Sequence, residues 1–329
     1  MLPLPRCEVS FPTTLDEALT LLARPGARVV AGGTDLLPNL KRGVGRPSAL
    51  VSLARVRGLD TIEQSGAELR IGARVTLADL ARSSRVPSAI AAAAALIASP
   101  QIRNVATVGG NLCLDTRCVY VNQTELWREA LGHCIKADGT ECHVVPSGRR
   151  CVAASSADLP PVLMALGAWV VLVSPRGSRT VPLERIFSGD GATPMALGEG
   201  ELLTEVTVPL PKGIDATYRK LRVRKAIDFP ILGLAVAVQL EGGVCHAIRI
   251  VASCIASAPR RVTKLDDLVV GRALDGAAID AVAQRCFDVL HPQANIAADA
   301  EWRRAMVPVL VREALLELLA RAGGDDGTA

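Results

Sequence analysis

The segment Gln101-Ile102-Arg103-Asn104-Val105-Ala106-Thr107-Val108-Gly109-Gly110-Asn111 places two adjacent glycines next to β-branched residues. Because glycine has no side chain, such a turn lets the backbone approach a ligand closely. Five of the chain's nine cysteines follow between Cys113 and Cys151, in a polar run that also contains His133 and His143. This combination predicts a ligand-binding turn beside a second site for metal or redox chemistry.

A similar turn occurs earlier in the chain. Residues 27–31 have the composition of a short strand, and they lead into Gly32-Gly33-Thr34-Asp35, with a helix expected over 36–41. Glycines after a strand can present free backbone N–H groups to an anion, although most such turns are only turns. The chain has neither a G-x-G-x-x-G motif after a strand nor a G-x-x-x-x-G-K motif, so neither a Rossmann nor a P-loop nucleotide site is expected.

The composition limits the class of protein. At 329 residues the chain is long enough for two or three domains. Half of the residues are hydrophobic but only 3% are aromatic, which fits helices packed on sheets. The net charge is only +4 and no basic run is interleaved with aromatics, so nucleic-acid binding is not expected. No apolar run reaches the roughly 20 residues of a membrane span and no secretory signal is evident. A cytoplasmic location without membrane contact is therefore expected, where clustered cysteines favour metal or redox sites over disulfides.

Local signals place the helices and strands. Thr14 and Glu17 form a capping box before a helix over 15–23, Thr76 caps a helix over 77–82, and prolines open a helix from Asp158 to Leu166. A buried helix over 87–98 and strands over 68–72, 169–174 and 201–209 complete the first part, and Lys212-Gly213 marks a domain boundary. Beyond it we expect strands at 218–221, 231–240 and 244–252, helices at 265–270, 277–289 and 301–321, and a disordered tail at 323–329.

Four motifs in this order resemble a known family. They are Val29-Val30-Ala31-Gly32-Gly33-Thr34-Asp35-Leu36, the segment from Gln101 to Asn111, Ser156-Ala157-Asp158-Leu159, and residues 218–228. Together they resemble the FAD-binding medium subunit of the xanthine dehydrogenase family of molybdenum hydroxylases, over nearly the whole chain. The resemblance implies an α+β protein. Two α/β FAD-binding subdomains of the PCMH type, residues 1–55 and 56–212, would precede an α+β domain of the CO dehydrogenase flavoprotein type, residues 213–329.

The resemblance also implies a set of FAD contacts. The residues that would wrap the pyrophosphate are Val29, Val30, Ala31, Gly32, Gly33, Thr34, Asp35 and Leu36. Those that would contact the flavin half are Thr107, Val108, Gly109, Gly110 and Asn111, and the remaining contacts would be Ile97, Asp158, Leu203 and Lys220. Simpler alternatives remain open: Asp158 as a helix N-cap, Lys220 as a solvated strand residue, and Thr34 and Asp35 as helix-start residues. No residue is expected to act as the acid or base for a substrate.

The cysteines lie in what the resemblance identifies as an insertion, at about residues 114–154. It contains Cys118, Cys134, Cys142 and Cys151, separated by 15, 7 and 8 residues. Four thiolates can hold either a [4Fe-4S] cluster or a tetrahedral zinc, and this spacing matches neither pattern well enough to choose. The two histidines lie beside expected ligands; either could replace one, but we expect them to be polar groups around the ligands and not ligands themselves. A loop of four thiols without metal is the remaining alternative.

An insertion of this kind resembles the branch of the family that reduces 4-hydroxybenzoyl-CoA, whose flavin subunit has an additional [4Fe-4S] cluster. That branch removes a phenolic hydroxyl with electrons from ferredoxin. The resemblance implies partner subunits, a large one with molybdopterin and a small one with [2Fe-2S] clusters, in a doubled heterotrimer. Three alternatives stay open: an FAD subunit of a hydroxylating dehydrogenase with a structural zinc, a stand-alone flavin-binding or zinc-stabilised module, and a self-contained flavin oxidase.

Overall fold

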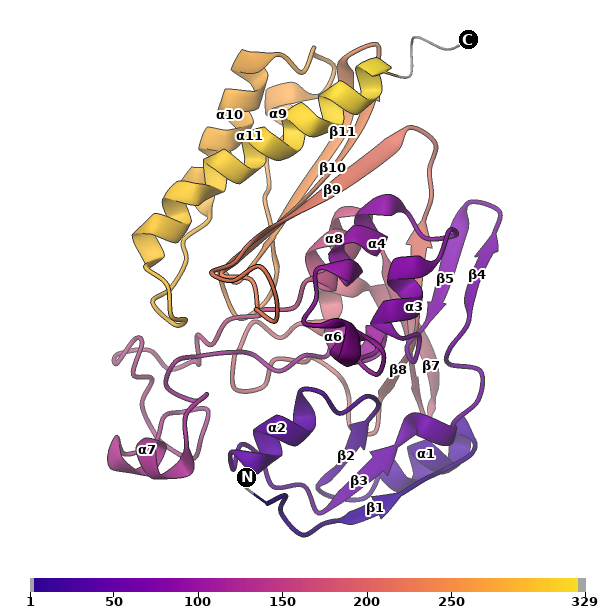
Figure 1. Cartoon of the computed structure of the whole chain (residues 1–329), viewed down its shortest axis with the longest axis vertical. Coiled ribbons are helices and arrows are strands. Elements are labelled where there is room, and N and C mark those ends of the chain that lie inside the picture. The colour runs from indigo at the N-terminus through magenta and orange to yellow at the C-terminus, as the bar shows by residue number, and fades with distance from the viewer. Residues whose placement is uncertain (1–2, 325–329) are drawn as a thin grey trace.

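The computed structural model describes residues 3–324 and arranges them in three units, one above another in Figure 1. The tail expected to be disordered lies outside the described residues from position 325 on, and its first two residues, Gly323 and Gly324, end the last helix. None of the helices in the described range combines the length and the apolar character that crossing a lipid bilayer requires.

The first unit is a three-stranded parallel sheet in the order β1 (Glu8–Ser10), β3 (Ala49–Ser52), β2 (Ala27–Val30). The capping box at Thr14 starts α1 (Leu15–Leu22), which buries Ala18 and Leu19 against β3. After β2 the chain turns through residues 31–35 into α2 (Leu36–Lys41). This turn therefore lies at the carboxyl end of a parallel strand, where ligand-binding loops of such sheets are found.

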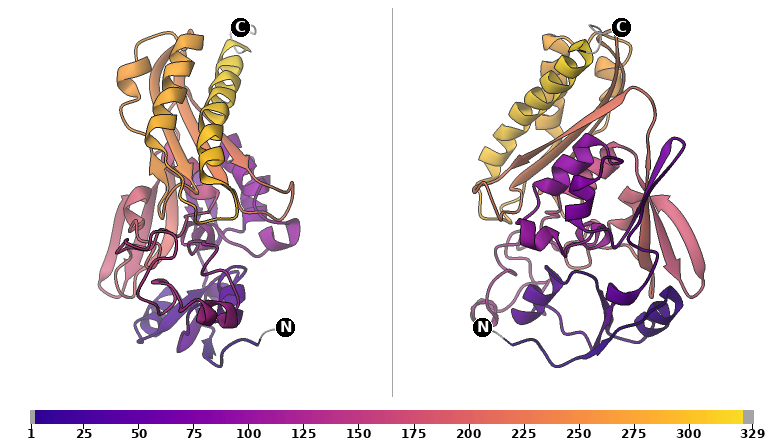
Figure 2. Two further views of the ribbon diagram at one scale, coloured as in Figure 1. Left: turned by 90° about the vertical axis from the view of Figure 1, so that its left-hand side faces the viewer. Right: turned by 45° about the vertical axis from the view of Figure 1, so that its right-hand side comes forward.

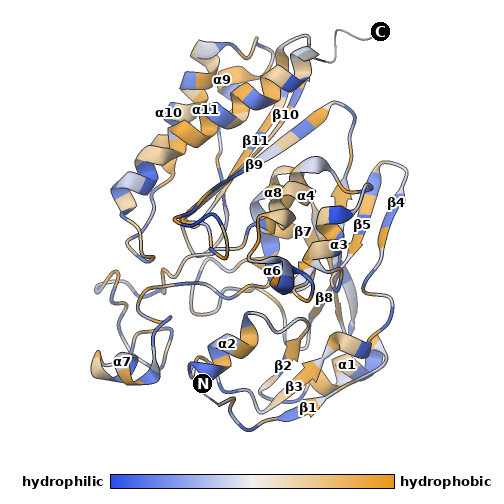
Figure 3. Ribbon diagram, in the orientation of Figure 1, coloured by the Kyte–Doolittle hydropathy of each residue, from blue (hydrophilic) through white to orange (hydrophobic). Residues whose placement is uncertain are grey.

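The second unit is an antiparallel sheet in the order β4 (Ile62–Ser65), β5 (Glu68–Gly72), β8 (Leu202–Pro209), β6 (Trp169–Ser174), β7 (Gly177–Pro182). Its helices are α3 (Leu77–Arg82), α4 (Ser88–Ala95), α5 (Pro100–Arg103), α6 (Val108–Leu112) and α8 (Leu159–Ala165). Every residue of α8 is buried, and its hydrophobic colour in Figure 3 reflects this position between two units. A short helix, α7 (Glu125–Ala130), projects from the insertion.

The third unit is an antiparallel sheet in the order β12 (Arg260–Arg261), β11 (Val244–Ser253), β10 (Leu232–Glu241), β9 (Ile214–Leu221). Helices α9 (Asp266–Val269), α10 (Gly276–Val289) and α11 (Ala300–Gly324) cover one face, as both views of Figure 2 show. Along β10, Leu234 and Val236 pack with these helices, whereas Ala235 and Ala237 join the core around α8. The strand is buried on both faces because it separates two cores, and its alanines leave room for α8.

Three expectations from the sequence need correction. The helix expected over 87–98 ends at Ala95. The second Gly-Gly pair lies inside α6 instead of in a turn. The side chain of Thr107 accepts a hydrogen bond from the N–H of Gly110 at 3.2 Å and so caps the start of this helix. Strand β9 is longer than expected, since pairing with β10 extends it back to Ile214.

Candidate functional site

A cleft of about 600 Å³ lies where the three units meet. Its walls come from the turn after β2, from α6 and the start of α8, and from residues 227–229 between β9 and β10. We refer to it as the central cleft. Its volume is in the range of cofactor sites, and its lining is mainly apolar with a few polar groups.

The central cleft brings together most of the residues expected to contact FAD. Those that line it are Val29, Val30, Ala31, Gly32, Gly33, Thr34, Asp35, Leu36, Ile97, Thr107, Gly109, Gly110, Asn111, Asp158 and Leu203. Val108 does not line it, because its side chain is fully buried in the core of the second unit. Lys220 also lies behind the wall, where it contacts Asp158.

The turn after β2 has the geometry of an anion-binding backbone. A Cβ atom on Gly32 would lie 1.9 Å from the carbonyl oxygen of Val105, so no side chain fits there. Gly33 has a φ of +68°, which glycine adopts without strain. In the described part of the chain, no backbone acceptor pairs with the N–H groups of Gly32, Gly33 and Thr34. These donors at the wall of the central cleft fit the pyrophosphate of FAD.

The α6 segment plays a different part. Its N–H groups at Val108 and Gly109 donate to the carbonyls of Val75 and Ala73, at 2.9 and 2.8 Å. A Cβ on Gly109 would lie 2.8 Å from that of Ala73, so glycine permits the close packing of α6 on this loop. The segment therefore offers the central cleft a surface and the side chains of Thr107 and Asn111, instead of free backbone donors.

Asp158 is more than an N-cap. Its side chain makes no capping hydrogen bond; instead Tyr218 donates to Oδ1 at 2.8 Å, and Lys220 lies 3.1 Å from Oδ2. Lys220 is not solvated either, since its side chain is only 1% exposed, and it also donates to the carbonyl of Leu96 at 3.0 Å. Burial raises the pKa of Asp158. The charge of Lys220 and the hydrogen bond from Tyr218 act in the opposite direction, but the effect of burial is larger. This ion pair fixes the start of α8 to strand β9.

Several cleft residues were not predicted. Arg117 ion-pairs with Asp35, donates to Asn39 Oδ1 at 3.3 Å, and has its guanidinium 4.6 Å from the ring centre of Phe229. Burial lowers the pKa of Arg117 to about 10. Ser156 also lines the central cleft, with a buried hydroxyl that has no hydrogen-bond partner among the described residues. The one sequence signal for Ser156 is that it begins the motif Ser156-Ala157-Asp158-Leu159, which contains the expected FAD contact Asp158.

The four cysteines of the insertion line one small cavity, which we call the cysteine cavity. Cys118, Cys134, Cys142 and Cys151 are each less than 10% exposed, and the other lining residues include Tyr120, Lys136 and His143. The thiols thus lie in a small buried cluster and not in an open polar loop. Within the described residues, no three His, Cys, Asp or Glu side chains are grouped tightly enough to hold a single metal ion.

Backbone donors point at two of the sulfur atoms. The N–H of Ala153 donates to Cys151 Sγ at 3.4 Å. Burial raises the pKa of Cys118, and hydrogen bonds from the backbone of Tyr120 and Val121 oppose that rise. Burial also raises the pKa of Cys151 to about 11. N–H groups directed at cysteine sulfurs are typical of iron–sulfur sites, where they stabilise the charge of the cluster. The donor set therefore fits such a cluster.

The insertion is attached to all three units. Arg128, which is buried, donates to the carbonyl of Arg42 at the end of α2 at 2.7 Å. The N–H of Gly191, which precedes β8 in the second unit, donates to the carbonyl of Cys151 at 2.9 Å, and Ser257 of the third unit donates to the same carbonyl at 3.0 Å. These contacts hold the cysteine cavity in a fixed place beside the central cleft.

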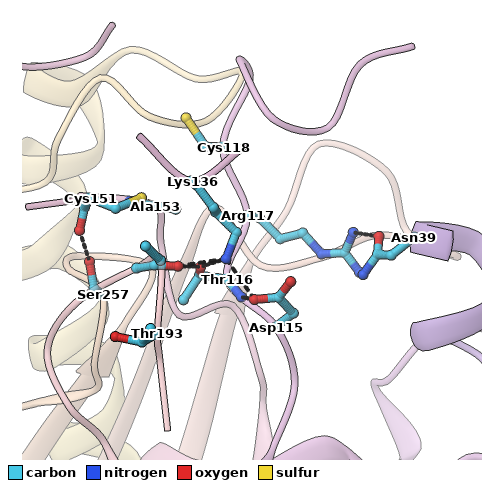
Figure 4. A network of polar contacts seen from close by, with 12 residues as sticks. Asn39, Asp115, Thr116, Arg117, Cys118, Lys136, Cys151, Ala153, Thr193 and Ser257 are labelled. Carbon is cyan, nitrogen blue, oxygen red and sulfur yellow. Dashed lines mark hydrogen bonds and ion pairs between the residues drawn. The ribbon is translucent and has the colours of Figure 1, made fainter. Parts of the chain in front are cut away.

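The two sites adjoin each other. Arg117 lines the central cleft, and the next residue, Cys118, lines the cysteine cavity. In Figure 4 the side chain of Arg117 runs toward Asn39 and that of Cys118 points the other way. Val44 also lines the central cleft and packs against the cysteine cluster. A single layer of residues therefore separates the two sites.

Comparison with known proteins identifies the family. Residues 5–211 match the model of the FAD binding domain in molybdopterin dehydrogenase, and residues 216–318 match the CO dehydrogenase flavoprotein C-terminal domain. The carbon monoxide dehydrogenase medium chain of Hydrogenophaga pseudoflava is 31% identical over 328 residues, which cover 98% of this chain and 99% of that protein. The chain belongs to the FAD-binding medium subunits of the molybdenum hydroxylase family.

Further relatives agree with this assignment. The aldehyde oxidoreductase FAD-binding subunit of Escherichia coli is 32% identical over 323 residues, covering 94% of this chain and 97% of that protein. A structure of carbon monoxide dehydrogenase from Hydrogenophaga pseudoflava superimposes with a TM-score of 0.80 at 29% sequence identity. The match covers 98% of this chain and 99% of the chain in that structure. The expected fold class and FAD as cofactor are confirmed, and this FAD-binding medium subunit is part of an oxidoreductase.

Proposed function

We propose that this chain is the FAD and [4Fe-4S] electron-transfer subunit of a 4-hydroxybenzoyl-CoA reductase. The observation that carries the proposal is the cysteine cavity: four buried thiols, with backbone donors directed at two of them, lie one layer of residues from the central cleft. A redox group has a reason to lie beside a flavin, because electrons must pass between them. A purely structural metal has no such reason.

In this proposal the donors of Gly32, Gly33 and Thr34 bind the pyrophosphate of FAD, and Cys118, Cys134, Cys142 and Cys151 bind the cluster. When bound, the cluster supplies one-electron steps and FAD exchanges either one or two electrons, so the subunit relays electrons from reduced ferredoxin to partner subunits. The chain's own residues hold the two groups at a fixed separation and exclude water from the thiols. The chemistry of dehydroxylation belongs to a partner.

The proposed partners are a large molybdopterin subunit and a small [2Fe-2S] subunit, in an assembly that is doubled. The relatives are named as a medium chain and as an FAD-binding subunit, words that presuppose companion subunits in those proteins. Co-purification with two other chains would support this arrangement. A stable, isolated monomer would favour a stand-alone flavin-binding module, and aerobic turnover by the isolated chain would favour a flavin oxidase.

Metal and flavin content test the proposal. Anaerobically purified protein is expected to contain about four irons and four acid-labile sulfides per FAD, with an EPR signal that appears on reduction by dithionite. Cys134→Ser removes one of the four thiolates and is expected to abolish that signal while FAD remains bound, because Cys134 lies outside the central cleft.

Cys7→Ser is the matched control, since Cys7 is partly exposed near the N-terminus and does not line the cysteine cavity. It is expected to leave iron, sulfide and the EPR signal unchanged. One zinc per chain, with neither iron nor sulfide, would overturn the cluster and with it the argument for 4-hydroxybenzoyl-CoA as substrate.

That result would support a second candidate function. The relatives include a carbon monoxide dehydrogenase, an aldehyde oxidoreductase and a xanthine dehydrogenase. This range of names favours, as the alternative, the FAD subunit of a hydroxylating molybdenum dehydrogenase in which the insertion binds a structural zinc. Four thiolates are a common ligand set for structural zinc, but among the described residues they are not grouped tightly enough for a single ion, so zinc binding would require the sulfurs to move closer together.

A further inference from the structure

One buried cation connects the two sites. The side chain of Lys136 lines the cysteine cavity and is only 4% exposed. Its ammonium group lies 2.7 Å from Asp115 Oδ1, 2.8 Å from Thr116 Oγ1 and 2.5 Å from the carbonyl oxygen of Gly191. Figure 4 shows the side chain of Lys136 directed toward Asp115 and Thr116. All three donor positions of the ammonium group are thus used, and the charge is held in place.

The partners of Lys136 belong to both sites. Asp115 lines the central cleft, and its carboxylate is 31% exposed. Gly191 packs against the cysteine cavity, since a Cβ on it would lie 2.9 Å from Cys151 Sγ, and its N–H donates to the carbonyl of Cys151 at 2.9 Å. Among the described residues that line the cysteine cavity, Lys136 has the only permanent positive charge.

Anchoring alone does not require a cation here. Thr116 already donates to the carbonyl of Gly191 at 2.6 Å, and the N–H of Gly191 donates to the carbonyl of Cys151 at 2.9 Å, so these segments are joined without Lys136. Transferring the charge of a Lys side chain from water to the protein interior costs free energy. A buried ion pair is therefore often no more stabilising than apolar residues of similar volume. The charge of Lys136 therefore points to a role at the thiolates that surround the cavity.

We propose that Lys136 is a positioning residue that sets the reduction potential of the cluster and that Asp115 moderates its effect. The inference rests on the proposed function, since it requires a cluster bound by the four cysteines. Four thiolates give the site a negative charge, and reduction by one electron from a one-electron donor adds one more negative charge. A fixed cation at the wall of the cavity stabilises the reduced form more than the oxidised form. An anion beside that cation has the opposite effect.

Potentiometric EPR titration of the anaerobic complex, with dithionite and mediators, tests the signs. Lys136→Met removes the cation at similar volume, so the midpoint potential is expected to fall. The expected size is at least about tenfold in the ratio of reduced to oxidised cluster, or about 59 mV for a one-electron couple. Asp115→Asn removes the moderating anion, so the potential is expected to rise. Lys136→Arg keeps the charge and is expected to stay close to the parent value.

A purely structural role would not move the potential in opposite directions in the two variants. Unchanged potentials, or shifts of the same sign, in variants that retain full iron and sulfide would overturn the inference and leave the proposed function standing. Parent protein without iron and sulfide would overturn both. If Lys136→Met does not retain its cluster, the midpoint potential of Asp115→Asn alone tests the inference. A higher potential than in the parent protein supports it, and an unchanged or lower potential overturns it.

Discussion

Gly32→Ala is expected to yield protein that purifies almost without FAD. The new Cβ would lie 1.9 Å from the carbonyl oxygen of Val105 and 2.6 Å from its carbonyl carbon, which are backbone atoms of the segment that leads into α6. Neither backbone can move without displacing a wall of the central cleft. Overpacking of this kind costs about 3 kcal/mol, which corresponds to about a hundredfold loss of affinity.

Flavin absorbance per chain after gel filtration, and titration of the FAD-free protein with FAD, measure the effect. Gly276→Ala is the matched control. Gly276 is the first residue of α10, and a Cβ there has no heavy atom within 4 Å, so FAD content and stability are expected to match the parent. Full FAD affinity in Gly32→Ala would contradict the assignment of this turn to the pyrophosphate.

Local sequence signals predicted much of this site because they depend on neighbouring residues only. The helix α2 and the turn before it follow from glycines after a β-branched strand, and the capping box at Thr14 is seen as predicted. The four cysteines were singled out by their number in a short stretch, and the structure brings them to one cavity. Their role as metal ligands stays a prediction.

Contacts between distant segments were beyond the reach of such signals. Arg117 and Phe229 are far apart in the sequence, and neither belongs to a local pattern that indicates a ligand site. Lys220 shows the same limit: a basic residue among other basic residues is usually solvated, but the register of β9 and β10 places it opposite Gly233 and beneath α8. Burial of a charge is decided by packing between units, which the sequence of one strand does not reveal.

The prediction that the Gly-Gly pair of α6 forms a turn was wrong for a related reason. Two glycines normally favour a turn, because each costs about 1 kcal/mol in a helix relative to alanine. Here the close approach of Gly109 to Ala73 and the hydrogen bonds to Ala73 and Val75 stabilise the helical conformation. Tertiary contacts thus outweigh the local preference, and the same contacts position Asn111, whose Oδ1 accepts a hydrogen bond from the N–H of Leu159 at 3.1 Å.

Lys220→Met is expected to destabilise the chain by about 3–5 kcal/mol, because it leaves the carboxylate of Asp158 buried without its cation. Tyr218→Phe removes only the hydrogen bond to Oδ1 and is expected to cost about 1–3 kcal/mol. Urea unfolding with FAD in saturating excess measures both. The double variant Lys220→Met with Asp158→Asn should recover part of the loss, since no buried charge then remains unpaired.

The loss in Lys220→Met should also depend on pH. Burial raises the pKa of Asp158, and without Lys220 only the hydrogen bond from Tyr218 and the more distant charge of Arg222 oppose that rise. Between the ordinary pKa of an aspartate and this raised value, the folded chain binds a proton that the unfolded chain has released. Stability of the variant therefore falls as pH rises through that window, and its deficit relative to the parent protein grows. A deficit that is the same at about pH 5 and about pH 8 would mean that Lys220 contributes through its packing and not through its charge.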